Sequence, residues 1–482
     1  MSDMSYFTNI TLGGQSYAVL IDTGSSDLWV SGEKVPNTKD TGVRTGVQYA
    51  VGQAEGVVFL ACSYGDSLIA DVLLLGPVLL ADLGFEGYYV KNQAFFFAEA
   101  NATNELPAPG IIGLGPFSTS AIVVALTTKT TTVQGLPPLD NIFQQNPNTP
   151  NFLTVLLGRA SDPDHNYPGD LTIMEILPGY EAVLEQPKLP VALAQHGNQH
   201  WSTLLDADGF IGPDGEPIPV KTGVKSTKNK KQLTVMFDTG YMAEAIYGRF
   251  TGSKLEKNSV LGEIWTLPCD AEVNITLKFS GQSIPIHPLD ATFPFSRIGS
   301  SRTDCYGTFQ AITTGANPDL DVIMGMAFLR NAYFLVNFGS DFSAVLPDHL
   351  RPVLNGTDNS EPPYIQLLPT SNDAAEVHDD FVQVRLEGKT FAELSALKAK
   401  AKSAGKTIAK GIIIAIVVVG VVFLGLIALC GYFCFRRRSG KLQSYRDLNA
   451  PAPAAAIDMH MYAPPPGPPV SGPYVTAWDH RP

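Results

Sequence analysis

A short motif that occurs twice constrains the fold of this chain more than any other feature of its sequence. The triplet Asp-Thr-Gly comes directly after a hydrophobic run at residues 22–24 and again at residues 238–240. Each copy is followed, much later, by two hydrophobic residues and a glycine, at 111–113 and at 323–325. The repetition predicts two related lobes, each of which presents one aspartate at the end of a β-strand.

The composition of residues 1 to about 350 is typical of an all-β protein. Short runs rich in Val, Ile, Thr, Tyr and Phe alternate with Gly, Pro, Asn and Asp, and the 482 residues include 44 Gly and 36 Pro. Long amphipathic helix patterns are nearly absent from this part. We expect an N-terminal lobe at 1–155, a C-terminal lobe at 156–350 and a stalk at 351–410.

The balance of charges excludes one class of partner. Lys and Arg total 33 against 46 Asp and Glu, which gives a net charge of -13 and makes nucleic acid an unfavourable partner. The part after residue 397 carries more basic than acidic side chains, so the acidic excess lies upstream of it. Because protonation removes the charge of carboxylates, this distribution favours an acidic working environment.

Two aspartates held close together can act as an acid and a base. Since neighbouring carboxylates cannot both ionise, one keeps its proton while the other stays charged. The charged group can deprotonate a water between them, and the protonated group can donate a hydrogen bond to the carbonyl of a peptide. Glycine lets the backbone bend around the carboxylate, and the threonine hydroxyl can tie one loop to the other. The sequence therefore predicts Asp22 and Asp238 as a catalytic pair, with four supporting residues: Thr23, Gly24, Thr239 and Gly240.

Residues 17–30, YAVLIDTGSSDLWV, resemble the signature of the pepsin-like aspartic peptidases, including fungal members, almost residue for residue. The resemblance covers about residues 5–350. It implies a bilobal all-β fold and an aspartic endopeptidase that cleaves polypeptides, works at acidic pH and needs no cofactor. It also implies that Ser25 hydrogen-bonds the Asp22 carboxylate and that Trp29 forms a wall near the substrate flap.

Two further features carry the same resemblance. Residues 63–66 resemble the flap hairpin, with Tyr64 closing over the substrate and Gly65 and Asp66 beside it. Cys269 and Cys305 resemble the disulfide of the C-terminal lobe. In an exported domain, a bridge that closes a loop of this length is expected to stabilise the fold by about 3 to 4 kcal/mol.

The chain departs from the family pattern near the second aspartate. Tyr241 stands where a small hydroxyl residue is usual, and its bulk would narrow the substrate cleft or remove a hydrogen bond to Asp238. Pro109 also stands where an acidic residue is usual. These departures keep a second function open, that of a catalytically weak or inactive membrane-anchored pseudo-peptidase that binds peptides or partners at a surface.

Residues 411–435 contain no charged side chain. As a helix this segment would span roughly 37 Å, more than the ~30 Å hydrocarbon core of a bilayer, so it predicts a single transmembrane helix. Basic residues flank it on both sides and leave its orientation open. Four glycosylation sequons lie upstream of it and favour an extracellular or lumenal location for residues 1–410, at the cell surface or in a vacuolar or secretory membrane: Asn9, Asn101, Asn274 and Asn355.

The two ends of the chain give further expectations. Residues 436–482 form a Pro-rich tail, predicted to be disordered and cytoplasmic, which is either a docking site for a proline-binding module or an inert spacer. The first residues carry no secretory signal, so we expect a signal peptide and a propeptide to be encoded upstream.

Residues 196–200 read His-Gly-Asn-Gln-His, a spacing that could suit a metal. Gly and Asn weaken a helix there, and the glutamate of the zinc-protease motif is missing, so we interpret both histidines as surface residues and expect no metal. A retroviral-type protease, which needs two copies of a one-motif chain, is excluded because both motifs lie in one chain. We therefore expect a monomeric catalytic unit.

Overall fold

The structure, a computed structural model, describes residues 6–51, 60–62, 72–98, 110–117, 120–127, 135–159, 169–195, 199–237, 244–248, 250–258, 262–298, 302–309, 318–339, 361–371 and 373–387. All of these belong to one unit, residues 1–397, and the second unit, residues 398–482, lies outside the described part. Strands dominate the described residues, so the predicted mainly-β architecture is confirmed.

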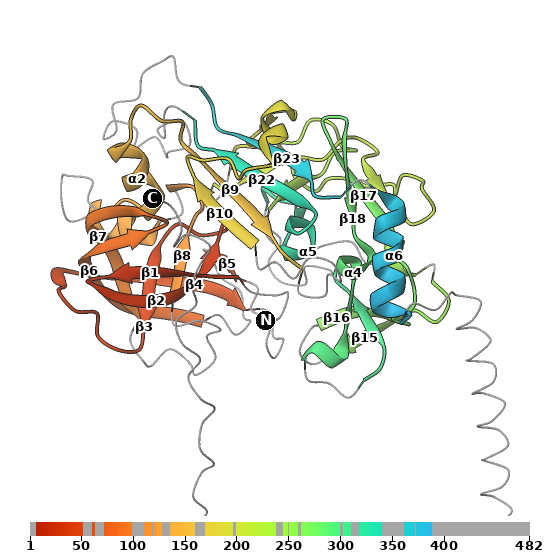
Figure 1. The fold of residues 1–482 in the computed structure, drawn as a ribbon, viewed down its shortest axis with the longest axis horizontal. Coiled ribbons are helices and arrows are strands. Elements are labelled where there is room, and N and C mark those ends of the chain that lie inside the picture. Colours follow the sequence, from red (N-terminus) through yellow and green to blue (C-terminus); the bar gives the residue numbers. More distant parts are fainter. Residues whose placement is uncertain are drawn as a thin grey trace, which may run out of the picture. The chain divides into compact units, whose positions relative to one another are not determined.

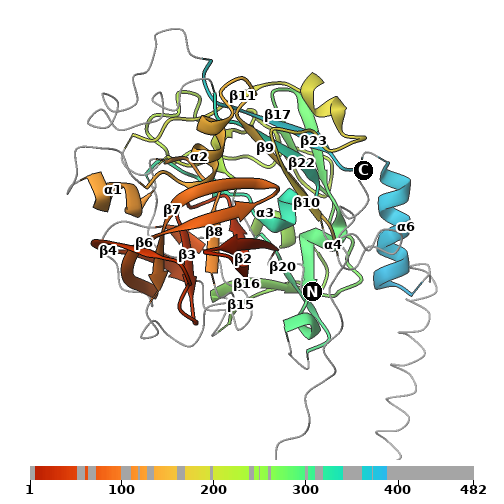
Figure 2. The same cartoon turned by 60° about the vertical axis from the view of Figure 1, so that its left-hand side comes forward.

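The first eight strands form one sheet in the order β1-β2-β8-β3-β7-β6-β4-β5 (Figures 1 and 2). Strand β1 also pairs with β6, so that the six strands β1, β2, β8, β3, β7 and β6 form a closed ring. Closure pairs strand edges that would otherwise be exposed. The bounds of these strands are Phe7–Leu12 (β1), Gln15–Asp22 (β2), Leu28–Ser31 (β3), Lys39–Val51 (β4), Leu60–Cys62 (β5), Val72–Phe85 (β6), Tyr88–Ala98 (β7) and Gly110–Gly113 (β8).

The hairpin between β1 and β2 depends on two glycines. Gly13 and Gly14 join the strands with φ angles of 63° and 93°, which residues with a side chain rarely adopt. A Cβ on Gly13 would also lie only 2.0 Å from the carbonyl oxygen of Pro36. The turn fixes the register in which β2 runs through the sheet and ends at Asp22.

The rest of the described chain forms four smaller sheets. The five-stranded sheet has the order β10-β9-β22-β23-β11, and in Figure 1 its strands β9, β10, β22 and β23 lie between the first sheet and strands β15 to β18. The bounds are Phe152–Leu157 (β9), Gly169–Ile173 (β10), Leu189–Pro190 (β11), Ser202–Leu204 (β12), Phe210–Ile211 (β13), Thr234–Met236 (β14), Lys254–Asn258 (β15), Gly262–Leu267 (β16), Ile275–Phe279 (β17), Gln282–Ile286 (β18), Thr292–Pro294 (β19), Cys305–Gly307 (β20), Val322–Ile323 (β21), Ala332–Asn337 (β22) and Tyr364–Pro369 (β23).

Helices are short and lie around the sheets. Helix α1 lies beside β4 and β7 (Figure 2), and α2 follows it in the chain. The bounds of the α-helices are Ala121–Thr127 (α1), Pro138–Gln145 (α2), Glu244–Tyr247 (α3), Pro288–Ala291 (α4), Met326–Leu329 (α5) and Ala374–Arg385 (α6), and two 3-10 helices span Glu181–Glu185 (η2) and Phe295–Ile298 (η3). None of the helices in the described ranges is long and apolar enough to cross a membrane, and the predicted transmembrane segment 411–435 lies outside those ranges.

The same parallel pairing occurs once in each half of the chain. Strand β2 pairs with β8 so that Leu20 lies opposite Ile111, and β14 pairs with β21 so that Met236 lies opposite Ile323. In both halves the first strand leads into an Asp-Thr-Gly triplet, and the second strand belongs to the hydrophobic-hydrophobic-Gly element. The repeat seen in the sequence is therefore a repeat of strand pairing. The lobe boundary expected near residue 155 stays a prediction.

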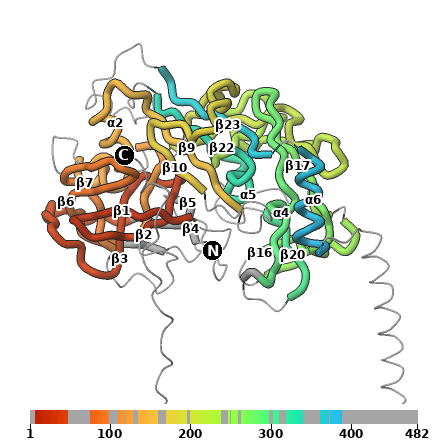
Figure 3. The backbone as a smooth tube through the Cα atoms, in the orientation of Figure 1, coloured from red at the N-terminus to blue at the C-terminus, as the bar shows by residue number. Residues whose placement is uncertain are grey.

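Part of the segment predicted as a stalk, 351–410, is folded. Strand β23 lies between β22 and β11 in the five-stranded sheet. Helix α6 lies alongside α4 (Figures 1 and 3), and the fully buried ring of Phe381 packs against Leu289 and Leu386. The folded part of the chain thus continues at least to the end of α6, because β23 pairs with the earlier strand β22 and α6 buries Phe381 against Leu289 of α4.

Candidate active site

The carboxyl group of Asp22 lies at the end of β2 and is only 7% exposed. Its Oδ1 accepts a hydrogen bond from the backbone N–H of Gly24 at 2.8 Å, and its Oδ2 accepts one from the Ser25 hydroxyl. The backbone carbonyl of Asp22 in turn accepts a hydrogen bond from the N–H of Leu114 at 2.7 Å. Both carboxylate oxygens and the backbone behind them are therefore held in place.

The surroundings of this carboxyl group shift its protonation. Burial raises the pKa of Asp22 above its ordinary value, because a charge is less stable out of water. Hydrogen bonds from the Ser25 hydroxyl and from the backbone N–H groups of Gly24 and Ser25 oppose part of this rise. The result is a carboxyl group that accepts hydrogen bonds in its charged form and also holds a proton more readily than a surface aspartate.

Two glycines, one at the end of β8 and one just after it, let this segment approach the Asp22 loop closely. A Cβ on Gly113 would lie 2.3 Å from the carbonyl carbon of Ser26, and one on Gly115 would lie 2.7 Å from the carbonyl oxygen of Ser25. The N–H of Gly115 donates to that same Ser25 oxygen at 2.6 Å. A side chain at either position would push the segment away from the Asp22 loop.

The Asp22 loop is tied directly to the other half of the chain. The hydroxyl of Thr23 donates a hydrogen bond to the backbone carbonyl of Phe237 at 3.2 Å. The ring of Phe237 is buried, and its centroid lies 5.1 Å from that of the Phe334 ring. The backbone N–H of Phe237 donates to the backbone carbonyl of Trp201 at 3.1 Å. The residue directly before Asp238 is therefore fixed next to the Asp22 loop. Four predicted residues of the second loop lie outside the described residues: Asp238, Thr239, Gly240 and Tyr241.

The comparisons with known proteins agree with this geometry. Residues 5–171 match the family model described as eukaryotic aspartyl protease. Rhizopuspepsin from Rhizopus chinensis is 29% identical over 349 residues, which cover 70% of this chain and 77% of the relative. This part of the chain is similar to the eukaryotic aspartyl proteases. The predicted enzyme class, an aspartic-type endopeptidase, is confirmed by this family and by the names of its relatives.

Further relatives of the protease are also fungal. An "Aspartic protease" from Phaffia rhodozyma is 24% identical, covering 69% of this chain and 73% of the relative. An "Acid extracellular protease" from Yarrowia lipolytica is 24% identical, and the match covers 70% of this chain and 79% of the relative. The crystal structure of an aspartic proteinase from Irpex lacteus superposes with a TM-score of 0.52 at 16% sequence identity, covering 78% of this chain and 97% of that one. The last match shows the pepsin-like fold alone.

The predicted wall residue Trp29 is part of the core of the protease. Its side chain is fully buried in β3 and stacks on Phe96 with ring centroids 5.9 Å apart. It packs in the same cluster as Leu20 and Ile111, behind the strand that carries Asp22. The flap residues that it was expected to support lie outside the described residues: Tyr64, Gly65 and Asp66.

A buried aspartate that the sequence analysis did not single out supports the loop from behind. Asp27 accepts hydrogen bonds from the hydroxyl of Ser120 at 2.5 Å and from the N–H groups of Ala121 and Ile122 at 2.7 and 3.3 Å. It thus satisfies the free N–H groups at the start of α1. Burial raises the pKa of Asp27 to about 6, against the opposing effect of these hydrogen bonds.

The interpretation of His200 as a surface residue is wrong. Its side chain is only 5% exposed, and its Nδ1 lies 3.1 Å from the carbonyl oxygen of Gly24 in the Asp22 loop. Burial lowers the pKa of His200 to about 4, so the ring is neutral above that pH. The neighbouring Trp201 also reaches the first half, donating from Nε1 to the carbonyl of Leu114 at 3.0 Å. The other histidine of this motif, His196, lies outside the described residues.

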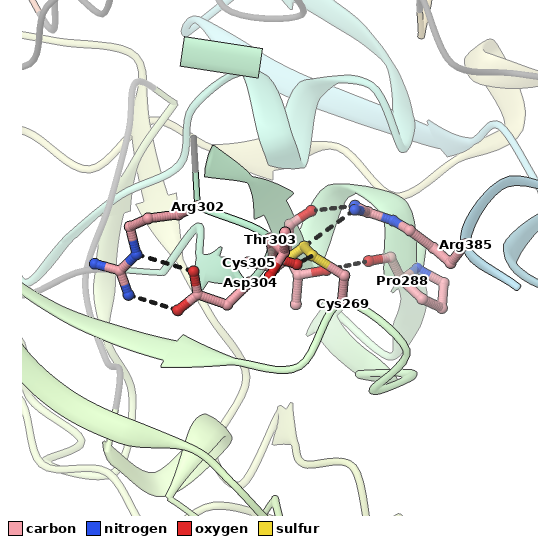
Figure 4. Close-up of a disulfide and its surroundings, with 8 residues drawn as sticks. Cys269, Pro288, Arg302, Thr303, Asp304, Cys305 and Arg385 are labelled. Carbon is pink, nitrogen blue, oxygen red and sulfur yellow. Dashed lines mark hydrogen bonds and ion pairs between the residues drawn. A yellow bond between two sulfur atoms is a disulfide. The ribbon is translucent and has the colours of Figure 1, made fainter. Parts of the chain in front are cut away.

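The predicted disulfide between Cys269 and Cys305 is confirmed (Figure 4). Cys305 belongs to β20, and the guanidinium of Arg385 at the end of α6 lies 3.1 Å from its sulfur atom. Arg385 also donates to the carbonyl of Thr292 at 2.8 Å. The bridge therefore lies where the four-stranded sheet meets α6.

The remaining predicted sites are at the surface or outside the described part. Asn9 in β1 and Asn274 before β17 are both exposed, whereas Asn101 and Asn355 lie outside the described residues. Among the residues with described positions, no group of three or more His, Cys, Asp or Glu side chains could hold a metal ion.

Proposed function

We propose that this protease cleaves polypeptides with a water activated between Asp22 and Asp238. The observation that carries the proposal is the hydrogen bond from the Thr23 hydroxyl to the carbonyl of Phe237, because it ties the loop of one aspartate to the residue next to the other. The repeated parallel pairing of β2 with β8 and of β14 with β21 supports it, since it presents both triplets at the end of equivalent strands.

The reaction needs one proton shared by the two carboxyl groups. The charged carboxylate takes a proton from the water while the water oxygen attacks the scissile carbonyl carbon. The protonated carboxyl group donates a hydrogen bond to the oxygen of that carbonyl. The tetrahedral intermediate then breaks its C–N bond, and the amine leaves with a proton from the carboxyl pair. The contacts from Gly24 and Ser25 hold the Asp22 carboxyl for this role, and its raised pKa favours retention of the shared proton.

An acidic working pH fits the buried carboxyl groups. The pKa values of Asp22, Asp27 and Asp140 are all raised by burial, that of Asp140 to about 8. Such groups enter the folded state most easily in their protonated forms. Relatives named "Acid extracellular protease" and "Vacuolar aspartic protease" suggest the same kind of compartment.

Cleavage can be tested with the full chain. Peptide hydrolysis is measured between about pH 3 and 6 with and without pepstatin, for the wild type and for the variants Asp22→Asn and Asp238→Asn. A matched control is Asp208→Asn, an exposed aspartate paired with Lys231 at the surface. We expect both catalytic variants and pepstatin to abolish cleavage and the control to leave it unchanged. Binding of peptides without any Asp22-dependent cleavage would instead support the pseudo-peptidase.

We further propose that residues 411–435 anchor the protease as a single-pass membrane protein, with residues 1–410 extracellular or lumenal. The uncharged run itself supports the anchor. The disulfide requires an oxidising compartment, and the exposed sequons at Asn9 and Asn274 are accessible for glycosylation.

The anchor is tested by extracting membranes at alkaline pH. The full chain should stay in the membrane fraction, and a chain lacking residues 411–435 should be released. Treatment with a glycosidase should shift the mobility of the wild type more than that of Asn9→Gln or Asn274→Gln. We also propose that the catalytic unit is monomeric, which sedimentation would test. We propose further that a proline-binding module can dock on the tail at residues 436–482, which a pull-down with a tail peptide would test.

A further inference from the structure

We propose that His200 is a positioning residue for the catalytic loop, acting through the peptide group between Gly24 and Ser25. The proposal rests on the proposed function, because it gives His200 a part in holding Asp22. The two partners are far apart in the sequence, yet Nδ1 of His200 lies 3.1 Å from the carbonyl oxygen of Gly24. Since a carbonyl oxygen only accepts hydrogen bonds, Nδ1 carries the hydrogen and donates it.

The bond to the Gly24 carbonyl acts on the Asp22 carboxyl through the backbone. This carbonyl belongs to the same peptide group as the N–H of Ser25, which is one of the groups that lower the pKa of Asp22. A hydrogen bond received by the oxygen of a peptide group polarises that group and strengthens the bond its N–H donates. The adjacent N–H of Gly24 donates to Asp22 Oδ1 at 2.8 Å. His200 thus stiffens the backbone from which two N–H groups point at the carboxyl.

Burial makes this bond necessary for the loop. Gly24 is buried, and His200 is only 5% exposed, so water does not readily replace either partner. A buried carbonyl left without a donor loses more stability than the bond itself contributes. In the described part of the chain, the ring of His200 is the donor that reaches this carbonyl.

The histidine is itself held in position by its neighbours in the sequence. The side-chain amide of Gln199 donates to the carbonyl of Ala192 at 2.9 Å and to that of His200 at 2.7 Å. The hydroxyl of Ser202 donates to the same Ala192 oxygen at 3.0 Å. On the other side, Trp201 donates from its indole to Leu114, which in turn donates to the backbone of Asp22. The ring therefore approaches the loop from a fixed segment.

The charge state of the ring suits positioning rather than charge stabilisation. Burial lowers the pKa of His200 to about 4, so well above that pH the ring is neutral and carries its one hydrogen on Nδ1. A neutral donor orders the loop without placing a positive charge beside Asp22.

The test compares three variants of the full chain. His200→Phe keeps a ring but removes the donor, His200→Asn places an amide nitrogen near the position of Nδ1, and His200→Gln places it farther out, near Nε2. We expect His200→Phe to lower kcat about 10-fold with KM changed by less than about 2-fold, since one hydrogen bond is lost and the substrate contacts stay. His200→Asn should keep kcat within about 2-fold of the wild type.

Two results would overturn the positioning role. One is a His200→Phe variant with the kcat of the wild type, and the other is a His200→Asn variant as impaired as His200→Phe. If His200→Phe does not fold, kcat is compared between His200→Asn and His200→Gln. We expect a higher kcat for His200→Asn, and equal kcat values for these two variants would overturn the proposal.

A second measurement separates this proposal from the proposed function. Nitrogen NMR of the wild-type chain with 15N-labelled histidine distinguishes the two neutral tautomers, and the His200 signals are assigned by their loss in His200→Asn. We expect hydrogen on Nδ1, and hydrogen on Nε2 would overturn the donor assignment. If the wild type shows no Asp22-dependent cleavage, the proposed function is wrong. The NMR measurement does not depend on cleavage and would still show which nitrogen of His200 carries the hydrogen.

Discussion

Thr23 and Phe237 come from opposite halves of the chain, and the hydroxyl of Thr23 lies 3.2 Å from the carbonyl oxygen of Phe237. This contact joins the two segments through a hydroxyl and a backbone carbonyl, and it leaves the Asp22 carboxyl to its contacts with Gly24 and Ser25. Because the Phe237 ring is buried against Phe334, the carbonyl that accepts the bond has little freedom to move. The position of the Asp22 loop relative to Phe237 therefore depends on a threonine hydroxyl.

Removal of that hydroxyl should slow catalysis more than it weakens substrate binding. Thr23→Val keeps the shape of the side chain but loses the donor, and we expect kcat to fall about 10-fold with KM nearly unchanged. Thr23→Ser keeps a hydroxyl and serves as the matched control. Steady-state kinetics at acidic pH checks this prediction, and equal kcat values for Thr23→Val and the wild type would contradict it.

Loss of the Asp27 carboxylate should destabilise the fold. Asp27→Ala removes the acceptor for Ser120, Ala121 and Ile122 together, so three donors at the start of α1 lose their partner. We expect the free energy of unfolding to fall by about 3 kcal/mol. Asp27→Asn keeps one acceptor oxygen and should lose clearly less. Urea denaturation monitored by tryptophan fluorescence measures both, and a loss as large in Asp27→Asn would argue against the capping role.

The stability of the protease should fall as the pH rises towards 8, and Asp140 should account for part of this fall. Burial raises the pKa of the Asp140 carboxyl to about 8, and its Oδ2 has no hydrogen-bond partner within the described residues. An unfolded aspartate titrates near about 3.9, so the folded state binds this proton more tightly than the unfolded state does. The stabilisation is therefore complete below about pH 4 and is lost as the pH rises through 8.

The variant Asp140→Asn tests this pH dependence. Its amide cannot ionise, so the melting temperature should change less between pH 5 and 8 than that of the wild type. The exposed Asp208→Asn is the control and should follow the wild type. If Asp140→Asn and the wild type showed parallel curves, ionisation of Asp140 would not be the cause.

The disulfide should contribute to the stability of the second half of the chain. Replacement of both Cys269 and Cys305 by serine removes a covalent link whose absence widens the unfolded ensemble, and we expect a loss of about 3 to 4 kcal/mol. Chemical denaturation of the double variant, compared with the wild type under oxidising and reducing conditions, measures it. Reduction should lower the stability of the wild type and leave that of the variant unchanged.

Helix α6 should be needed for a stable fold. Phe381→Ala would leave a cavity against Leu289 and Leu386, with an expected cost of about 3 to 5 kcal/mol. Gln383→Ala, an exposed position of the same helix, is the control and should cost little. Thermal unfolding of the two variants checks the prediction, and similar melting temperatures would mean that α6 is only loosely attached.

The sequence alone predicted the features that depend on local patterns. The contacts of Asp22 with Gly24 and Ser25 follow from residues adjacent in the chain, and the pairing of Cys269 with Cys305 followed from the family resemblance. The repeated triplets predicted two related lobes with an aspartate at the end of a strand, and the repeated strand pairing agrees with that repeat.

Features that depend on distant contacts were missed. Nothing in the residues around His200 shows that Gln199 and Ser202 fix their segment to Ala192 and bury the ring. The motif was therefore interpreted by its polar composition, which is typical of a surface loop. The residues of β23 were also expected to form part of a stalk, and their place inside a sheet depends on pairing with β22, which comes earlier in the chain.

The position of β23 determines the order in which the protease can mature during synthesis. This strand lies between β22 and β11, so the sheet that also holds β9 and β10 is completed only when residues near 369 have left the ribosome. The first sheet, whose strands end at Gly113, can form long before that. A nascent chain stalled before Tyr364 would therefore carry a complete first sheet and a five-stranded sheet that still lacks β23. We expect chaperones to bind the open edge of the incomplete sheet.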